Sequence, residues 1–221
     1  MKQHGRVNVR SFVEPMFTEN GYVVSLSGGD AWIIDPGFAP QPDQIAAYLD
    51  SQHLRPLAIV LTHCHVDHIA GVTPLRARYP DVPLWCPRNE QHMLDDPIAN
   101  LSAAMMMSIT APPAERLIAP GDTLTLGDTS WAVLDVSGHS PGGLAFHCAD
   151  CSVVFTGDSL FFGSIGRYDF PGSNRDRLLR NIVENLFALP DATAMYSGHG
   201  PPSTIGFEKR HNVTLRRELI S

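Results

Sequence analysis

Cysteines and long apolar runs are both scarce in this sequence. Four cysteines in 221 residues do not make a disulfide framework, so we expect a reducing compartment, the cytoplasm. No apolar stretch approaches the ~20 residues of a membrane span, which argues against a membrane protein. The first residues, MKQHGRVNVRSF, alternate polar and apolar side chains with no apolar run behind the basic ones, unlike a secretory signal.

Basic residues are also few. Lys and Arg number 16 against 23 Asp and Glu, which gives a formal net charge of −7. A phosphate backbone binds a surplus of cations, so this balance argues against nucleic acid as a partner. Hydrophobic content of 43% and charged content of 18% are typical of a globular protein, and the length predicts a single domain over residues 1–221.

Apolar periodicity predicts strands in both halves of the chain, with helices between them. The predicted strands cover residues 7–13, 22–26, 32–35, 57–61, 123–126, 131–136, 144–148, 152–156 and 192–196. The predicted helices cover residues 42–53, 72–79 and 176–189. This order indicates two sheets packed face to face beneath helices, with polar loops at the strand ends along one rim.

Residues 95–117 differ from the rest because they are rich in proline and methionine, including Met105, Met106 and Met107. We favour a helix that covers the core, in which methionine fills gaps. The alternative is a flexible apolar wall beside a substrate cleft. The stretch 101–109 fits a subunit interface as well as a cleft, so the oligomeric state stays open.

A dense histidine cluster follows the apolar run 57–61. His63, His65, Asp67 and His68 lie within six positions. Neutral imidazole nitrogens and carboxylate oxygens are the ligands that borderline divalent metals prefer. Crowding such polar groups at the end of a buried strand is costly unless an ion compensates them. The cluster therefore predicts a metal site.

Three further candidate ligands, His139, Asp158 and His199, each follow a glycine near the end of a predicted strand. Glycine lets the backbone turn sharply and project the next side chain. With the cluster they make seven ligands, too many for one tetrahedral zinc ion and suited to two metal ions that share a carboxylate. Zinc is the divalent ion we expect first, and iron and manganese suit the same ligands.

The cysteines are not assigned to this site. Cys64 lies between two ligands, at a position that we expect to face away and pack inertly. Cys148 and Cys151 form a lone C-x-x-C pair, which is weak evidence for zinc or redox chemistry. We expect a tight hairpin at that pair instead.

The motifs His-x-His-x-Asp-His, Gly-His-Ser-Pro-Gly, Gly-Asp and Gly-His-Gly, in this order, resemble the metallo-β-lactamase superfamily across nearly the whole chain. The resemblance implies an α/β (α+β) fold, a four-layer αββα sandwich. The first metal ion would be held by His63, His65 and His139, and the second by Asp67, His68 and His199, with Asp158 bridging. In that family an aspartate placed as Asp35 is here supports the ligand loop.

Two such ions imply hydrolytic chemistry. Metal ions ~3.5–4 Å apart share a water and lower its pKa from about 15.7 to about 7, which gives hydroxide at neutral pH. One ion polarises a carbonyl oxygen, and the other stabilises the leaving group. The metal-bound water is the predicted nucleophile, supported by Asp67, and no side chain is assigned that role.

Residues 157–172 and 197–206 are similar to the glyoxalase II, or hydroxyacylglutathione hydrolase, branch in its short bacterial form. The resemblance implies hydrolysis of a small-molecule acyl thioester such as S-D-lactoylglutathione. Arg167 stands where the long form has a basic residue that contacts glutathione, and a guanidinium pairs bidentately with a carboxylate. A surface arginine, or an ion pair that braces the fold, explains Arg167 equally well.

Two departures from the long form concern the glutathione pocket. About twenty residues follow His199, so we expect no C-terminal helical domain of the kind that completes that pocket. Pro201 and Pro202 replace an aromatic residue that follows the last ligand histidine in the long form. The prediction of a thioester substrate is therefore separate from the prediction of glutathione as its thiol.

Other activities on the same scaffold compete with this one. A persulfide dioxygenase shares residues 166–170 but uses one iron, whereas the intact motif at His199 favours a second metal ion. A lactone or other ester hydrolase is an alternative because its substrate offers the same carbonyl. A β-lactamase is disfavoured because Asp158 stands where one major subgroup has cysteine, and a nuclease is disfavoured by the net charge. A structural metal protein without turnover needs only four ligands, fewer than are present here.

Overall fold

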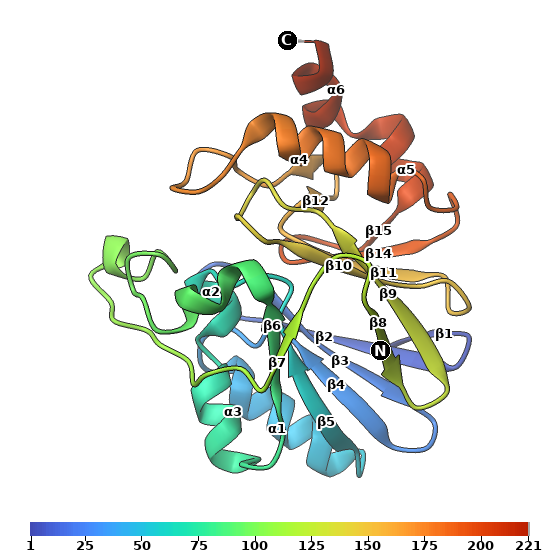
Figure 1. The fold of residues 1–221 in the computed structure, drawn as a ribbon. Helices are drawn as coiled ribbons and strands as arrows, with labels where there is room; N and C mark the ends of the chain where they lie inside the picture. The colour runs from blue at the N-terminus through green and yellow to red at the C-terminus, as the bar shows by residue number, and fades with distance from the viewer. Residues whose placement is uncertain (221) are drawn as a thin grey trace.

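The computed structural model describes residues 1–220. Two β-sheets pack face to face, and helices cover both outer faces (Figure 1). The predicted four-layer αββα sandwich of mixed α and β structure is therefore confirmed.

The first sheet has seven strands in the order of the sequence. Its first four strands pair antiparallel and its last four pair parallel, with the change at the fourth strand. The strands are β1 Lys2–His4, β2 Val7–Val13, β3 Asn20–Leu26, β4 Asp30–Ile34, β5 Arg55–Val60, β6 Leu84–Pro87 and β7 Arg116–Ile118.

The second sheet has six strands in the order β15-β14-β11-β10-β9-β8. They are β8 Thr123–Leu126, β9 Thr129–Asp135, β10 Leu144–Cys148, β11 Val153–Gly157, β14 Ala194–Ser197 and β15 Ser203–Thr204. Strands β11 and β14 run parallel, while their other neighbours run antiparallel. A separate small hairpin joins β12 Leu160–Phe161 to β13 Ser164–Ile165.

The helices lie on the outer faces of the two sheets (Figure 1). The first sheet is covered by α1 Gln41–Ser51 and α3 Val72–Arg78, and the second by α4 Arg175–Asn181, α5 Ile205–His211 and α6 Val213–Ile220. Shorter pieces are α2 Val66–Ile69, η1 Arg88–Leu94, η2 Ala103–Met105 and the π turn η3 Ile182–Leu186. Within residues 1–220 no helix has the length and apolar content needed to cross a membrane.

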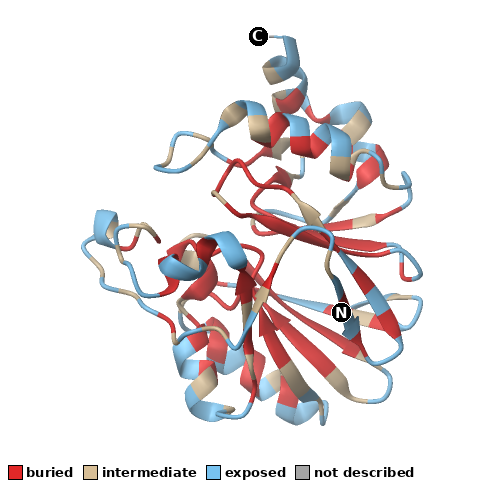
Figure 2. Ribbon diagram, viewed as in Figure 1, coloured by how far each residue is buried: buried red, intermediate tan, exposed pale blue. Residues whose placement is uncertain are grey.

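The core between the sheets is built around large aromatic side chains. Trp32 of the first sheet lies 5.6 Å, ring centre to ring centre, from Trp131 of the second, and Phe155 lies 5.9 Å from Trp131. Buried residues run along most of both sheets (Figure 2). Strands β10 and β11 are buried at every position because the other sheet covers one face and helices cover the other.

All of the predicted strands form, with bounds shifted by up to two residues. The helix expected over residues 176–189 begins at Arg175 and changes at Ile182 into the π turn η3. Cys148 and Cys151 lie in the β10–β11 hairpin as predicted, and both are free thiols. Cys64 is fully buried among the apolar side chains beneath the first sheet, which confirms its packing position.

The helix that we favoured over residues 95–117 is wrong, because residues 95–115 form an ordered loop with a single 3₁₀ turn at η2, and strand β7 begins at Arg116. In this loop, side chains form the hydrogen bonds to backbone N–H and carbonyl groups that a helix would form within its own backbone. The Oδ1 atom of Asp96 accepts from the backbone N–H groups of Ile98 and Ala99, and the Asn100 amide donates to the carbonyl of Ile109 at 2.9 Å. Prolines in the same stretch lack the N–H that a helix interior needs.

Candidate metal centre

The histidine cluster lies directly after β5. His63, His65 and His68 are all buried, with at most 4% of the residue surface exposed. The short helix α2 follows at once and carries Asp67 and His68. The strand end and the first turn of this helix therefore aim the cluster at one rim of the sandwich.

The other three predicted ligands come from the second sheet. His139 lies in the loop from β9 to β10, Asp158 follows β11, and His199 follows β14. Because β11 and β14 are parallel, their carboxyl ends meet at the same edge. Gly157 has a φ of 50°, a left-handed conformation that turns the chain just before Asp158.

Backbone hydrogen bonds join the two sheets along this rim. The N–H of Leu144 in the second sheet donates to the carbonyl of Thr62 beside the cluster at 2.9 Å. The N–H of Asn20 at the start of β3 donates to the carbonyl of Gly198 at 2.7 Å. Ligands from both sheets are thereby held at a fixed separation.

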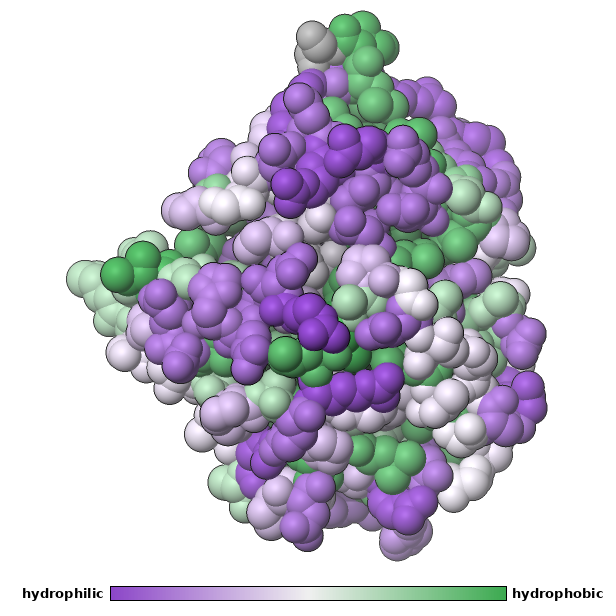
Figure 3. Space-filling model, in the orientation of Figure 1, coloured by the Kyte–Doolittle hydropathy of each residue, from purple (hydrophilic) through white to green (hydrophobic). Residues whose placement is uncertain are grey.

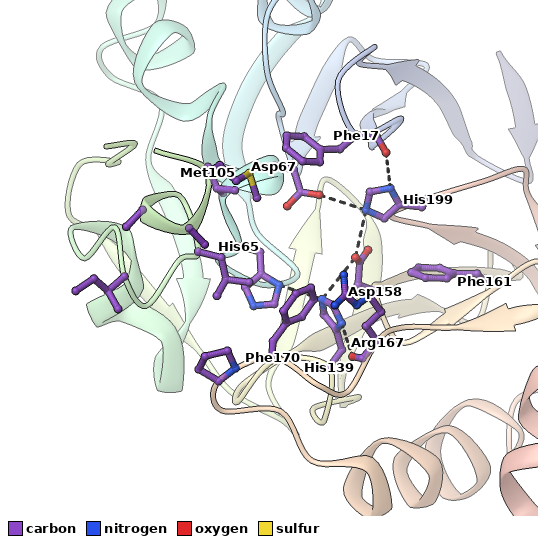
Figure 4. A pocket seen from close by; sticks show the side chains of 16 residues that line it. Phe17, His65, Asp67, Met105, His139, Asp158, Phe161, Arg167, Phe170 and His199 are labelled. Carbon is purple, nitrogen blue, oxygen red and sulfur yellow. Dashed lines mark hydrogen bonds and ion pairs between the residues drawn. The ribbon is translucent and has the colours of Figure 1, made fainter. Parts of the chain in front are cut away.

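The seven predicted ligands come together at this rim, and Figure 4 shows five of them: His65, Asp67, His139, Asp158 and His199. Two groups have ligand atoms within 4.8 Å of one another: His63, His65 and His139 in one, and Asp67, His68 and His199 in the other. Asp158 lies between them, because its Oδ2 is 3.6 Å from Nε2 of His139 and 3.2 Å from Nε2 of His199. Its Oδ1 is 3.4 Å from Nε2 of His68.

The outer nitrogens of three histidines face hydrogen-bond acceptors. Nδ1 of His139 donates to the carbonyl of Arg167 at 2.8 Å, and Nδ1 of His199 to the carbonyl of Phe17 at 3.2 Å. Nδ1 of His68 lies 3.1 Å from Oδ2 of Asp35. A carbonyl oxygen only accepts, so a hydrogen sits on Nδ1 of His139 and of His199, and Nε2 of each ring points to the centre of the site.

The donor set fits divalent metal ions. Nε2 of His63 is buried and has no hydrogen-bond partner among residues 1–220. A buried polar atom left unpaired costs about 1–3 kcal/mol. Coordination of a cation by this lone pair would remove that cost, and imidazole with carboxylate is the donor set of zinc, iron and manganese sites.

The two groups differ in charge. Burial lowers the pKa of His63 and His139. Burial and the neighbouring imidazole of His139 lower the pKa of His65 to about 3, so all three imidazoles are neutral near pH 7. Burial also opposes charge on His199, but Asp158 and hydrogen bonds to Asp158 and Asp67 outweigh it and raise the pKa to about 10. The carboxylates of Asp158 and Asp67 therefore stabilise positive charge at the second group.

Asp35 supports the ligand loop from below. Its Oδ1 accepts from the backbone N–H of Thr62 at 2.7 Å, and its Oδ2 accepts from the Thr62 hydroxyl at 2.5 Å. The same carboxylate faces Nδ1 of His68, so it fixes both the loop and one imidazole. A third group of close donor atoms, Asp35, His63 and His68, arises from this contact.

Glu90 is a buried carboxylate of the site that the sequence analysis did not identify. Its Oε2 accepts from the backbone N–H of Cys64 at 2.6 Å, and its Oε1 accepts from that of Gly142 at 2.7 Å. One side chain on η1 therefore ties the first histidine loop to the loop of His139. No motif surrounds Glu90, so only the fold brings it to the ligands.

Substitution Glu90→Gln is expected to loosen both loops. The amide nitrogen cannot accept, so one backbone N–H loses its partner, at a cost of about 1–3 kcal/mol in the free energy of unfolding. Metal affinity is expected to fall about 10- to 100-fold, as for other groups that orient ligands. Urea unfolding and competition with a chelator measure the two effects. The exposed Glu184→Gln is the matched control, and equal behaviour of the two variants contradicts the role given to Glu90.

A pocket of about 540 Å³ opens above the ligands. His65, Asp67, His139, Asp158 and His199 form its floor (Figure 4). The loop of residues 98–105 lines one side of the pocket. This segment is therefore an apolar wall beside a cleft, which was the alternative to a helix over residues 95–117.

Arg167 lies at the pocket and is largely exposed. Its guanidinium pairs with Asp169 at 2.8 Å and lies 4.3 Å from the ring centre of Phe170. Its backbone carbonyl holds His139. The side chain is therefore placed for a substrate contact, and it also braces its own loop.

The model of the metallo-β-lactamase superfamily matches residues 16–199, most of the chain and all seven predicted ligands. The chain belongs to this superfamily. Its αββα sandwich is the metallo-β-lactamase fold, and its histidines and aspartates form clusters suited to metal ions in this metal-binding superfamily. It is accordingly a metallo-hydrolase of the superfamily.

Two curated relatives cover nearly the whole chain. The probable metallo-hydrolase YqgX of Bacillus subtilis is 37% identical over 197 residues, 89% of this chain and 92% of the relative. The hydroxyacylglutathione hydrolase GloC of Haemophilus influenzae is 29% identical over 211 residues, 95% of this chain and 98% of the relative. These two relatives carry different names within the same superfamily.

Three solved structures are similar over the whole fold. BLEG-1, described as a B3 metallo-β-lactamase, has a TM-score of 0.89 and 36% identity, covering 93% of this chain and 98% of its own. TTHA1623 in a di-iron-bound form has a TM-score of 0.81 and 35% identity, covering 92% and 98%. ETHE1 of Myxococcus xanthus has a TM-score of 0.79 and 26% identity, covering 96% and 88%.

Proposed function

We propose that this metallo-hydrolase cleaves acyl thioesters at a site that holds two divalent metal ions. The observation that carries the proposal is the position of Asp158 between two groups of three ligands. A carboxylate so placed suits two ions that share it. The similarity to TTHA1623, which is described in a di-iron-bound form, supports the count of two.

In this proposal each group of ligands holds one ion. His63, His65 and His139 would hold the first ion and Asp67, His68 and His199 the second, and Asp158 would be shared between them. Zinc is the ion we expect first, with iron and manganese as the alternatives. When bound, the pair of ions supplies hydroxide at neutral pH and stabilises the oxygen charge that develops on the carbonyl.

The side chains around the ions position the reactants. Asp67 lines the pocket, where its carboxylate would accept a hydrogen bond from the attacking water. Burial favours its neutral form, but His68 and His199 outweigh this effect and lower the pKa of Asp67, which keeps the carboxylate charged. Arg167 also lines the pocket, and its guanidinium would have to leave its pair with Asp169 to meet a carboxylate of the substrate.

Two observations support a thioester. The curated relative GloC, aligned over 95% of this chain, is named a hydroxyacylglutathione hydrolase. Residues 157–172, which resemble that branch, contribute Asp158, Phe161, Arg167 and Phe170 to the pocket. The resemblance therefore falls on residues that can touch a substrate.

The experiment is thiol release by purified protein whose metal ions have been counted. The substrates are S-D-lactoylglutathione and S-acetyl-N-acetylcysteamine, a thioester of a small neutral thiol. We expect turnover of at least one, with close to two ions per chain. His65→Ala should lose both activity and metal, whereas the exposed His92→Ala should lose neither.

Two results would contradict the proposal. Two bound ions without turnover of any thioester would leave a hydrolase of lactones, other esters or β-lactams, the last suggested by the similarity to BLEG-1. A single bound iron without turnover would favour persulfide oxidation, the alternative brought forward by the similarity to ETHE1. The complete second group of ligands argues against that alternative.

A further inference from the structure

The pocket above the ligands is walled by apolar side chains. Ile98, Leu101, Ala103, Ala104 and Met105 form one side, and Phe17, Phe161 and Phe170 lie around the rest (Figure 4). The polar lining residues other than Arg167 are all candidate ligands. If the candidate ligands bind metal ions, the remaining surface that a substrate can contact is mostly apolar.

The wall of residues 98–105 is ordered by buried polar groups. Asn100 is fully buried, and its amide donates to the carbonyls of Met93 and Ile109 at 3.0 and 2.9 Å. Its own carbonyl accepts from the N–H of Val66, next to the ligand His65, at 2.9 Å. The wall is thus fixed directly to the ligand loop, and a group bound against it keeps a set position relative to the metal site.

Charge in the pocket does not suit glutathione. That tripeptide carries two carboxylates, which need cationic partners. Arg167 is the one Lys or Arg among the described residues that line the pocket, and its guanidinium is paired with Asp169. Two other cations near the C-terminus, Lys209 and Arg210, pair with Asp191 and do not line the pocket.

Exposed apolar side chains continue the wall outward. Ile98 is 77% exposed, and apolar atoms gather on the lobe that this loop forms at the left of the molecule (Figure 3). Met106, which is 98% exposed, lies next to Met105 but does not line the pocket. The two methionines therefore separate the effect of the pocket wall from that of the surface.

We propose that the pocket selects thioesters whose acyl group is an uncharged alkyl chain, which lies along residues 98–105. The inference rests on the proposed function and narrows its substrate class. In the reaction the oxygen of water bonds to the carbonyl carbon, the carbon–sulfur bond breaks, and the thiolate takes up a proton. The chain stays against the wall while the small thiol leaves.

The test is a series of N-acetylcysteamine thioesters with acetyl, butyryl, hexanoyl and octanoyl groups. A fully buried methylene raises kcat/KM about fourfold, and in a pocket open on one side we expect about twofold. The octanoyl ester should therefore exceed the acetyl ester by a factor of about 60. S-D-lactoylglutathione should be poorer than the octanoyl ester.

Met105→Ser is expected to lower the ratio of octanoyl to acetyl kcat/KM about fivefold, while Met106→Ser leaves it unchanged. Urea unfolding shows whether both variants remain folded. A flat or falling series, a preference for S-D-lactoylglutathione, or equal ratios in the two variants would overturn the inference and leave the thioesterase proposal standing. Failure of every thioester would instead refute the proposed function, and this inference with it.

Discussion

Replacement of Asp158 by alanine is expected to lower kcat/KM for acyl thioesters by about 10³-fold or more. Its carboxylate lies within 3.6 Å of imidazole nitrogens from both ligand groups, so its loss weakens both metal positions. Stabilisation of transition-state charge by metal ions contributes several kcal/mol, and about 4 kcal/mol corresponds to a factor of about 10³. Steady-state kinetics and elemental analysis on the same preparation measure activity and metal together.

The matched control is Asp150→Ala, in the β10–β11 turn. Asp150 has a side chain that is 73% exposed and lies outside the pocket lining. Activity and metal content should stay near those of the unsubstituted protein. An Asp158→Ala variant that keeps two ions and ordinary kcat/KM would show that Asp158 does not bridge.

Substitution Gly198→Ala is expected to reduce kcat/KM by about 10²-fold with no ligand removed. A Cβ atom at this position would lie 2.0 Å from Oδ1 of Asp158 and 2.7 Å from Cε1 of His68, closer than atoms can approach. Both side chains must shift, and a displacement of about 1 Å at a reacting centre can cost 10²-fold in rate. Overpacking should also lower the free energy of unfolding by about 1–3 kcal/mol.

The control for this variant is Gly28→Ala. A Cβ atom at Gly28 meets no heavy atom within 4 Å, and its φ lies outside the left-handed region. Stability should be unchanged or rise by less than about 1 kcal/mol. Metal counts distinguish the two variants, since Gly198→Ala should lose the ion of the second ligand group first. Two tightly bound ions and full activity in Gly198→Ala would contradict this prediction, because they would mean that the neighbouring side chains shift around the added methyl group without disturbing the site.

The candidate ligands could be predicted from the sequence because most of them follow closely on the end of a strand. His63 follows an apolar strand whose pattern is strong, and Asp158 and His199 follow glycines at two more strand ends. Their convergence was harder to predict, since it depends on the pairing of β11 with β14 and on hydrogen bonds between the sheets. The family resemblance supplied that information.

Two parts of the site could not be predicted from local patterns. Glu90 is a single carboxylate in a polar stretch, and its partners Cys64 and Gly142 lie 26 and 52 positions away. The apolar residues near Met105 suggested a helix, but local hydrogen bonds of Asp96 and Asn100 hold them in a loop. Side chains that satisfy the backbone compete with helix formation in ways that apolar spacing does not report.

The loop of residues 98–105 has a consequence for how this protein can diverge. It supplies a wall of the pocket yet contributes no candidate ligand, and it is anchored through the main chain of Val66 and Asn100. Mutations along this loop can therefore change which molecules are accepted while the reaction itself is inherited intact. Related proteins can therefore acquire new substrates through substitutions in this loop, without an intermediate sequence that has lost activity.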